Sequence, residues 1–172
     1  MRLYRSQIPG IAEDIIATLQ LDGDIVVDND DRTDAEQDIR AIMDEYLRQE
    51  SRVVQETREF MEQHQITYDQ FGRIKSQFAD KRSHPTGDEG IRWIMGQVLE
   101  NFMISRYVAE VFGEDRKMRK TLMRLFRKHL VEEADLDREV RGRLKNMRPG
   151  TDKWDIEYRR LMDEVRRKRG LV

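Results

Sequence analysis

The sequence contains no cysteine, so disulfide bonds and zinc or iron–sulfur sites with cysteine ligands are excluded. It has only three prolines, while hydrophobic and charged residues each make up 38%. It also lacks a long apolar run, because Pro9, Glu13 and Asp14 interrupt the most apolar stretch, residues 8–21. This composition favours amphipathic helices over buried sheets or disorder. We therefore expect a cytoplasmic protein that does not enter a membrane.

What the sequence does contain is an internal repeat with an offset of 83 residues. Residues 33–64 carry a stripe of apolar side chains at helical spacing, formed by Ile39, Ile42, Met43, Tyr46, Leu47, Val53, Val54, Phe60 and Met61. The corresponding stripe 83 residues later is formed by Leu122, Leu125, Phe126, His129, Leu130, Leu136, Val140 and Leu144. Residues 8–19 match residues 91–102 at the same offset. The sequence therefore predicts two fused copies.

The first copy predicts three helices. The first should span residues 7–20, and Thr33 with Glu36 forms a capping box that opens a long central helix. A last helix follows after residue 66. Gln49 and Glu50 interrupt the middle of the apolar stripe, so the central helix is expected to kink or leave the core there. Glu132 and Glu133 stand at the same two places in the second copy.

The second copy predicts the same three helices, of which the last opens at Asp152. The boundary falls in the only linker-like stretch, residues 83–87, which gives a first helical repeat of residues 1–85 and a second of residues 86–172. The predicted fold is all-α, with two tandem three-helix repeats packed into one pseudo-symmetric helical body. The prediction allows for very short strands near 25–27 and 107–108.

The end of the chain carries the only distinctive sequence motif. Trp154, Asp155, Tyr158 and Arg159 form a Trp-Asp-x-x-Tyr-Arg pattern in a basic tail. This tail, the opening Met-Arg-Leu and the two-copy layout resemble the bacterial domain of unknown function 507 family. The resemblance implies an intracellular bacterial protein. It supplies no catalytic or ligand residues, because no activity is established for the family.

Known catalytic motifs are missing from the sequence. It has no phosphate loop, dinucleotide-binding glycines, nucleophile elbow or His-Glu-x-x-His pattern, so we predict no catalytic residue, no cofactor and no enzyme activity. His129 occupies the stripe position of Tyr46. It is read as a packed, hydrogen-bonded histidine, with a metal ligand beside Glu132 or Glu133 as the alternative.

Two groups of carboxylates invite a metal-binding interpretation. The acidic run that begins at Asp22 and ends at Asp31 lacks the spacing and glycine of a calcium loop, so turn formation and capping explain it better. Glu50 and Glu133 are matched residues that could approach each other across a pseudo-twofold axis. An exposed helix middle is the preferred reading, and we predict no metal ligands.

The charge of the chain is unevenly distributed. Residues 1–85 have 11 basic and 18 acidic side chains, and residues 86–172 have 21 and 16. Four matched positions reverse sign between the copies: Asp34 and Lys117, Glu36 and Arg119, Asp44 and Arg127, Glu45 and Lys128. Such reversal could dock the halves, link two chains or give distinct partner faces, and the last is preferred. The candidate interaction surface consists of Lys117, Arg119, Lys120, Arg124, Arg127, Lys128, Arg166, Arg167, Lys168 and Arg169.

The expected function is that of a non-enzymatic, cytoplasmic protein-interaction or regulatory module. The alternative is association with nucleic acid or the ribosome through the basic second repeat. A third possibility is a carboxylate metal-binding protein. Other proteins are the expected partners, nucleic acid is the alternative, and the sequence leaves the oligomeric state open.

Overall fold

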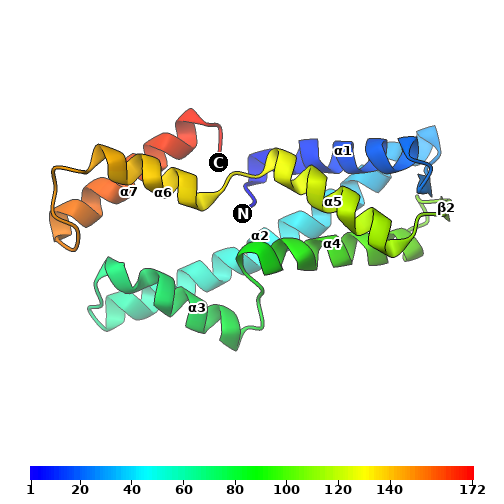
Figure 1. The fold of residues 1–172 in the computed structure, drawn as a ribbon. Helices are drawn as coiled ribbons and strands as arrows, with labels where there is room; N and C mark the ends of the chain where they lie inside the picture. The colour runs from blue at the N-terminus through cyan, green and yellow to red at the C-terminus, as the bar shows by residue number, and fades with distance from the viewer. The chain divides into compact units, whose positions relative to one another are not determined.

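A computed structural model describes all residues 1–172 (Figure 1). It is all-α apart from two short strands, as the sequence predicts. The chain forms two compact units: unit 1 comprises Met1–Leu47 and Thr86–Leu130, and unit 2 comprises Arg48–Pro85 and Val131–Val172. Each unit therefore contains part of both sequence repeats: a border lies after Pro85, at the predicted boundary, and each repeat is divided once more within itself.

The borders of the units coincide with the polar interruptions of the apolar stripes. Besides the border after Pro85, the units divide after Leu47 and after Leu130, two positions that are 83 residues apart. Polar or charged residues follow directly in both copies: Gln49 and Glu50, and Glu132 and Glu133. Because charged side chains are rarely buried unless they are paired, the apolar core does not continue through these positions.

Unit 1 contains helices from both repeats and the only sheet. Its elements are η1 (Arg5–Gln7), α1 (Ile8–Leu21), β1 (Ile25–Val26), η2 (Asn29–Asp31), the first part of α2 (Arg32–Gln63), α4 (Gly87–Ile104), β2 (Glu110–Val111) and α5 (Asp115–His129). Helix α5 packs against both α1 and α4 (Figure 1). The antiparallel strands pair Ile25 with Val111 and Val26 with Glu110. β2 thus lies three residues beyond the predicted strand, because the chain first makes a turn in which Val108 N–H bonds to Ser105 O.

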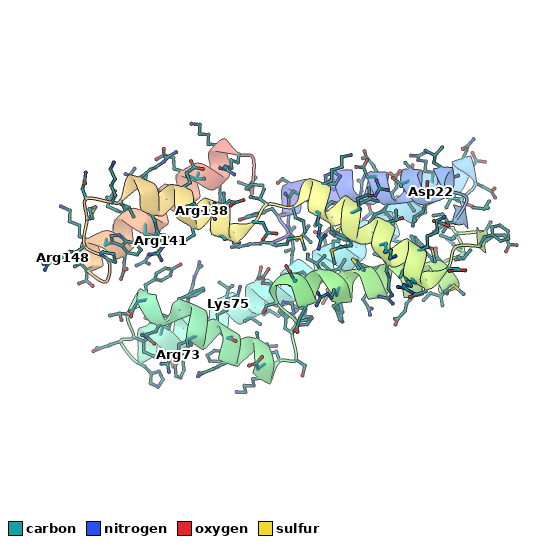
Figure 2. All side chains as sticks on the ribbon, in the orientation of Figure 1. Asp22, Arg73, Lys75, Arg138, Arg141 and Arg148 are labelled. Atoms are coloured by element: carbon teal, nitrogen blue, oxygen red, sulfur yellow. The ribbon has the colours of Figure 1, made fainter.

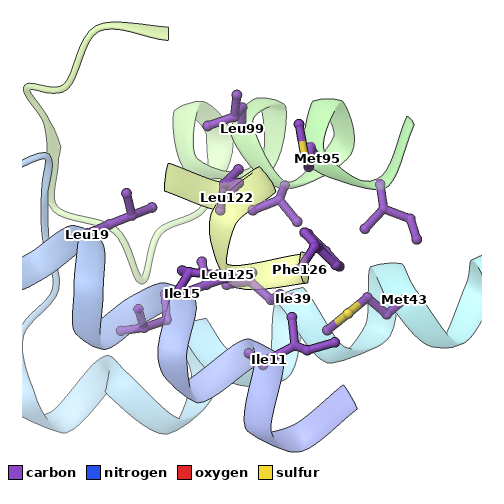
Figure 3. Packing of buried hydrophobic residues seen from close by; sticks show 14 of the residues in the cluster. Ile11, Ile15, Leu19, Ile39, Met43, Met95, Leu99, Leu122, Leu125 and Phe126 are labelled. Carbon is purple, nitrogen blue, oxygen red and sulfur yellow. The ribbon is translucent and has the colours of Figure 1, made fainter. Parts of the chain in front are cut away.

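The core of unit 1 is built from matched residues of the two copies (Figure 3). The matched positions of the first helices are all buried: Ile8, Ile11, Ile15, Ile16 and Leu19 on α1, and Ile91, Ile94, Val98, Leu99 and Phe102 on α4. Ile39 and Met43 of α2 and their matched residues Leu122 and Phe126 of α5 belong to the same cluster. Each such side chain contributes about 1.5–3 kcal/mol by leaving water, so this cluster holds the four helices together.

Unit 2 contains two helical hairpins. The latter part of α2 is followed by η3 (Tyr68–Gln70) and α3 (Phe71–Lys81), and α6 (Glu133–Arg143) is followed by α7 (Asp152–Lys168). The rings of Phe60 on α2 and Phe78 on α3 pack edge to face, with their centroids 5.5 Å apart. Helix α7 begins at Asp152, as predicted. The hydroxyl of the preceding residue, Thr151, caps it by accepting a hydrogen bond from Trp154 N–H.

The central helix of the second copy is broken next to Glu132 and Glu133, where the sequence predicts at most a kink or a departure from the core. α5 ends at His129 and α6 begins at Glu133, with Leu130 and Glu132 in extended conformation. Charges explain the break, because cations stabilise the C-terminus of a helix and anions its N-terminus. The last turn of α5 carries Arg127, Lys128 and His129, and the first turn of α6 carries Glu133 and Asp135. In the first copy α2 runs through the equivalent region without a break.

Candidate functional site

A groove lies between α4 and α5 in unit 1. Its volume is about 730 Å³. The lining residues are Arg92 and Met95 from α4, and Asp115, Arg116, Arg119, Lys120, Met123, Arg124 and Arg127 from α5. The groove therefore combines two methionines with six cationic side chains and one carboxylate. We call this surface the basic groove.

Helical periodicity explains why α5 supplies most of the basic groove. Arg116, Lys120 and Arg124 follow one another at intervals of four residues, so they lie along one exposed face. Leu122 and Leu125 lie on the opposite face and are buried. Met123 lies among the cations and is half-buried, and Met95 of α4 is part of the core cluster. The floor of the groove is thus a continuation of the apolar core.

Most cations of the basic groove have no anionic partner in the structure. Arg119 Nε donates to Asp115 Oδ2 at 2.6 Å, within α5. The others, which form no ion pair, are Arg92, Arg116, Lys120, Arg124 and Arg127. This face of α5 therefore carries positive charge that no ion pair compensates. The cations also repel one another, because like charges four residues apart on a helix are neighbours. An anionic group bound there would relieve the repulsion.

The cations of α6 are arranged differently. Arg138 and Arg141 belong to α6 (Figure 2). Arg138 pairs with Asp135 at 3.1 Å, and Arg141 Nε donates to both oxygens of Asp137 at 2.9 Å. Arg143 pairs with Glu139 at 2.8 Å. The α6 surface therefore neutralises its own charge, and the lack of pairing in the basic groove is a property of that surface and not of the whole chain.

The structure places four of the predicted interaction residues in the basic groove: Arg119, Lys120, Arg124 and Arg127. The other predicted residues of α5, Lys117 and Lys128, lie outside it and form ion pairs with repeat 1. The predicted residues 166–169 belong to unit 2, at the end of α7 and just beyond it.

Lys117 neutralises a buried carboxylate. Its ammonium lies 2.7 Å from Oδ1 of Asp24, whose side chain is only 4% exposed. This carboxylate raises the pKa of Lys117, chiefly through the hydrogen bond. Gly113 allows the close packing, because a Cβ at that position would lie 2.7 Å from Cβ of Asp24. Asp24 thus ties the start of α5 to the loop after α1.

His129 is hydrogen-bonded, as the preferred reading predicted. Its Nε2 lies 2.7 Å from Asp14 Oδ2, and an ionised carboxylate there requires Nε2 to be the protonated nitrogen. Lys128 donates to the same oxygen at 2.8 Å. The hydrogen bonds from Lys128 and then His129 lower the pKa of Asp14. The end of α5 is therefore fixed to α1 by a shared carboxylate.

Glu50 and Glu133 each pair with a cation of their own hairpin. Lys75 lies 3.0 Å from Glu50, and Arg166 lies 3.3 Å from Glu133. No group of three or more histidine, aspartate or glutamate side chains in the structure is placed to hold a metal ion. The preferred interpretation, an exposed helix middle, is therefore wrong for both: the Glu50 side chain is only 14% exposed, and Glu133 is the first residue of α6.

Residues of the tail motif are structural parts of unit 2. Trp154 stacks on Tyr158 with ring centroids 5.0 Å apart, and the guanidinium of Arg141 lies 5.2 Å from the Trp154 ring. Tyr158 donates to Asp137 at 2.6 Å. Burial, followed by this hydrogen bond, raises the pKa of Tyr158 well above its ordinary value. The motif thus fastens α7 to α6.

Sequence reasoning missed the residues that α4 adds to the groove, Arg92 and Met95. Nothing near them in the sequence connects them with α5, since the pairing of the two helices is a tertiary contact. Met123 could have been found, because it is an apolar residue on an otherwise cationic helix face.

Comparisons with known proteins agree with the tail motif. A family model described as "Protein of unknown function (DUF507)" matches residues 1–171. A search of the curated proteins finds no similar sequence. None of the helices combines the length and the apolar character needed to cross a membrane.

Proposed function

The chain belongs to the DUF507 family, whose function is unknown, and we propose that it is a non-enzymatic protein-interaction module of the cytoplasm. Its basic groove binds an acidic, amphipathic helix of a partner protein. The observation that carries this proposal is the row of unpaired cations above a methionine floor. Unpaired cations attract an acidic partner, and the half-buried Met123 beside the buried Met95 offers apolar area to be buried.

A helix is the element that fits such a groove. Amphipathic helices dock by placing one apolar face in a groove between two helices, with anchors at intervals of three and four residues. Methionine is common on surfaces of this kind, because its flexible thioether adapts to different side chains. Carboxylates at the edges of the helix would then face Arg92, Arg119 and Arg124.

The methionine floor favours a protein over a nucleic acid. Phosphate groups of a duplex are neutralised by surface cations and leave an apolar floor unused. Single strands need aromatic side chains for base stacking, and the lining of the groove has none. Binding to nucleic acid is therefore the competing outcome that the experiment must separate.

Fluorescence anisotropy with defined probes tests the proposal. The first probe is a synthetic amphipathic helix with leucines on one face and glutamates on the other. The second is the same helix with serines in place of the leucines, and the third is an RNA duplex. We expect the leucine–glutamate helix to bind most tightly of the three probes. Its affinity should fall at least about tenfold when the leucines of the helix and the cations of the groove are replaced.

The test variant carries Lys120→Glu and Arg124→Glu, at exposed positions without intramolecular partners. The matched control carries the same charge change at Lys145→Glu and Arg148→Glu, in the exposed loop between α6 and α7. The groove variant should lose the leucine–glutamate helix, and the control should keep it. The proposal is wrong if the RNA duplex binds more tightly than both helices, or if the two variants behave alike.

A further inference from the structure

Large apolar side chains are exposed to solvent at the end of unit 1 where helices α1 and α4 end. Leu21 is 87% exposed and Phe112 is 69% exposed. Backbone hydrogen bonds bring their segments together, since Asp24 N–H donates to Leu19 O and Phe112 N–H donates to Asp24 O. Figure 1 shows that α1 and α4 both end at the sheet. Ile104, at the end of α4, is 84% exposed.

Exposed carboxylates lie on the same segments as these apolar side chains or next to them in the chain. Asp22 lies at the end of α1 (Figure 2), and three more exposed carboxylates on the segments around the sheet are Asp28, Asp30 and Glu110. None of the four forms an ion pair in the structure. We call Leu21, Asp22, Asp28, Asp30, Glu110 and Phe112 the acidic tip.

The acidic tip and the basic groove are complementary in two respects. The tip presents exposed apolar side chains among unpaired anions, and the groove presents a methionine floor among unpaired cations. Burial of apolar area supplies affinity, while complementary charges supply orientation and a fast association rate. Contact between two tips is disfavoured, because their carboxylates would repel each other.

We propose that the acidic tip of one molecule docks in the basic groove of a second copy of this chain. Leu21 and Phe112 pack on Met95 and Met123, and the carboxylates of the tip face the cations of the groove. The contact is heterologous, since it joins two different surfaces. It uses the groove of the proposed function, so a partner helix must compete with the tip.

Sedimentation velocity and light scattering of the full-length protein test this proposal. We expect the mean mass of the wild type to exceed that of a monomer at low ionic strength and to rise with concentration. In about 0.5 M salt the mass should fall toward that of a monomer, because exposed charges are then screened. A wild type that stays monomeric at low salt and high concentration would overturn the proposal.

Two variants locate the contact. The groove variant is the one with Lys120→Glu and Arg124→Glu, and the tip variant carries Asp28→Lys and Asp30→Lys. Each alone should be monomeric and should keep the helical circular dichroism of the wild type. An equimolar mixture should form a one-to-one dimer, because it contains one intact tip and one intact groove. Self-association of either variant alone, at the level of the wild type, would overturn the proposal.

A chain with all four substitutions provides a test that does not depend on loss of an interaction. The reversed charges at positions 28 and 30 of the tip then attract the reversed charges at positions 120 and 124 of the next copy, so self-association should return in part. If it stays monomeric while it folds normally, tip and groove do not meet. The peptide experiment is independent: a monomeric wild type that binds the leucine–glutamate helix would refute self-association and leave the proposed function standing.

Discussion

Replacing Lys120 by glutamate should stabilise the protein while it impairs the basic groove. Lys120 is exposed, and Arg116 and Arg124 lie four residues before and after it on α5. Each pair of like charges at this spacing destabilises a helix by about 0.2–0.5 kcal/mol, and opposite charges stabilise by a similar amount. Lys120→Glu reverses the sign of both pairs. Lysine and glutamate have similar helix propensities, so charge is the main change.

The expected gain in the free energy of unfolding is about 0.5–1 kcal/mol at low salt. The full reversal of two pairs would give more, but solvent screens exposed charges. The Arg116 pair also has the less favourable orientation, with the cation before the anion. Lys120→Gln removes the repulsion without adding attraction, so it should give about half of the gain.

Urea denaturation at low ionic strength and in about 0.5 M salt measures this effect. The gain should shrink in high salt for both variants, and the m-value should stay constant. A loss of stability in Lys120→Glu at low salt would refute the reasoning, as would a gain that salt leaves unchanged. Side chains that are kept for binding commonly make the folded protein less stable than it could be.

Further predictions concern the two units and their titrating groups. Leu125→Ala in unit 1 and Leu136→Ala in unit 2, both at buried positions, should each lower the free energy of unfolding by about 2–5 kcal/mol. Each should shift the fluorescence transition of the tryptophan in its own unit, Trp93 or Trp154. A single transition that both tryptophans share would contradict separate cores. The lowered pKa of Asp14 adds stability above its ordinary pKa of 3.8 that is lost as the pH falls below it, so Asp14→Asn should unfold more easily at neutral pH and flatten the acid limb of an unfolding curve. The raised pKa of Tyr158 adds stability below its ordinary pKa of 10.0 that is lost at higher pH. Because Tyr158 does not ionise near that pH, Tyr158→Phe should leave the tyrosinate absorbance step there unchanged. A smaller step would contradict the burial.

The apolar core could be predicted because helical periodicity is local. The spacing of Ile8, Ile11 and Ile15 is visible in a short window of sequence, and the 83-residue offset extends it to the second copy. Glu132 and Glu133 indicated a kink after His129 but not a full break, since the apolar stripe continues across it. The signal was in the charges: the cations of the last turn of α5 precede the anions of the first turn of α6, and this order marks two helix ends.

Half of the candidate site could be predicted, and the limit has the same cause. Lys120 and Arg124 belong to one helix face, so their grouping follows from the sequence. Arg92 and Met95 join them only through packing of α4 on α5, which no local pattern encodes. The division into units was indicated by polar residues in the stripes, but which halves pair depends on long-range contacts.

The reversed charges of the two copies now divide into two groups. Distinct partner faces were preferred because exposed ion pairs contribute only about 0–1 kcal/mol each. That argument does not apply to Lys117, because its partner Asp24 is buried, and a buried carboxylate without its cation is strongly destabilising. Lys128 likewise binds Asp14 of repeat 1. These two reversals dock the copies.

Arg119 and Arg127 are the reversals that remain for a partner. Both line the basic groove, and neither contacts repeat 1 through an ion pair. Lys117 and Lys128 therefore hold α5 in place on one side, while Arg119 and Arg127 lie along the groove. The same change of sign could thus serve two purposes because successive cations of a helix face different surroundings. A partner-binding role for the reversed charges applies to the groove pair alone, and the docking pair should be left intact in any experiment on binding.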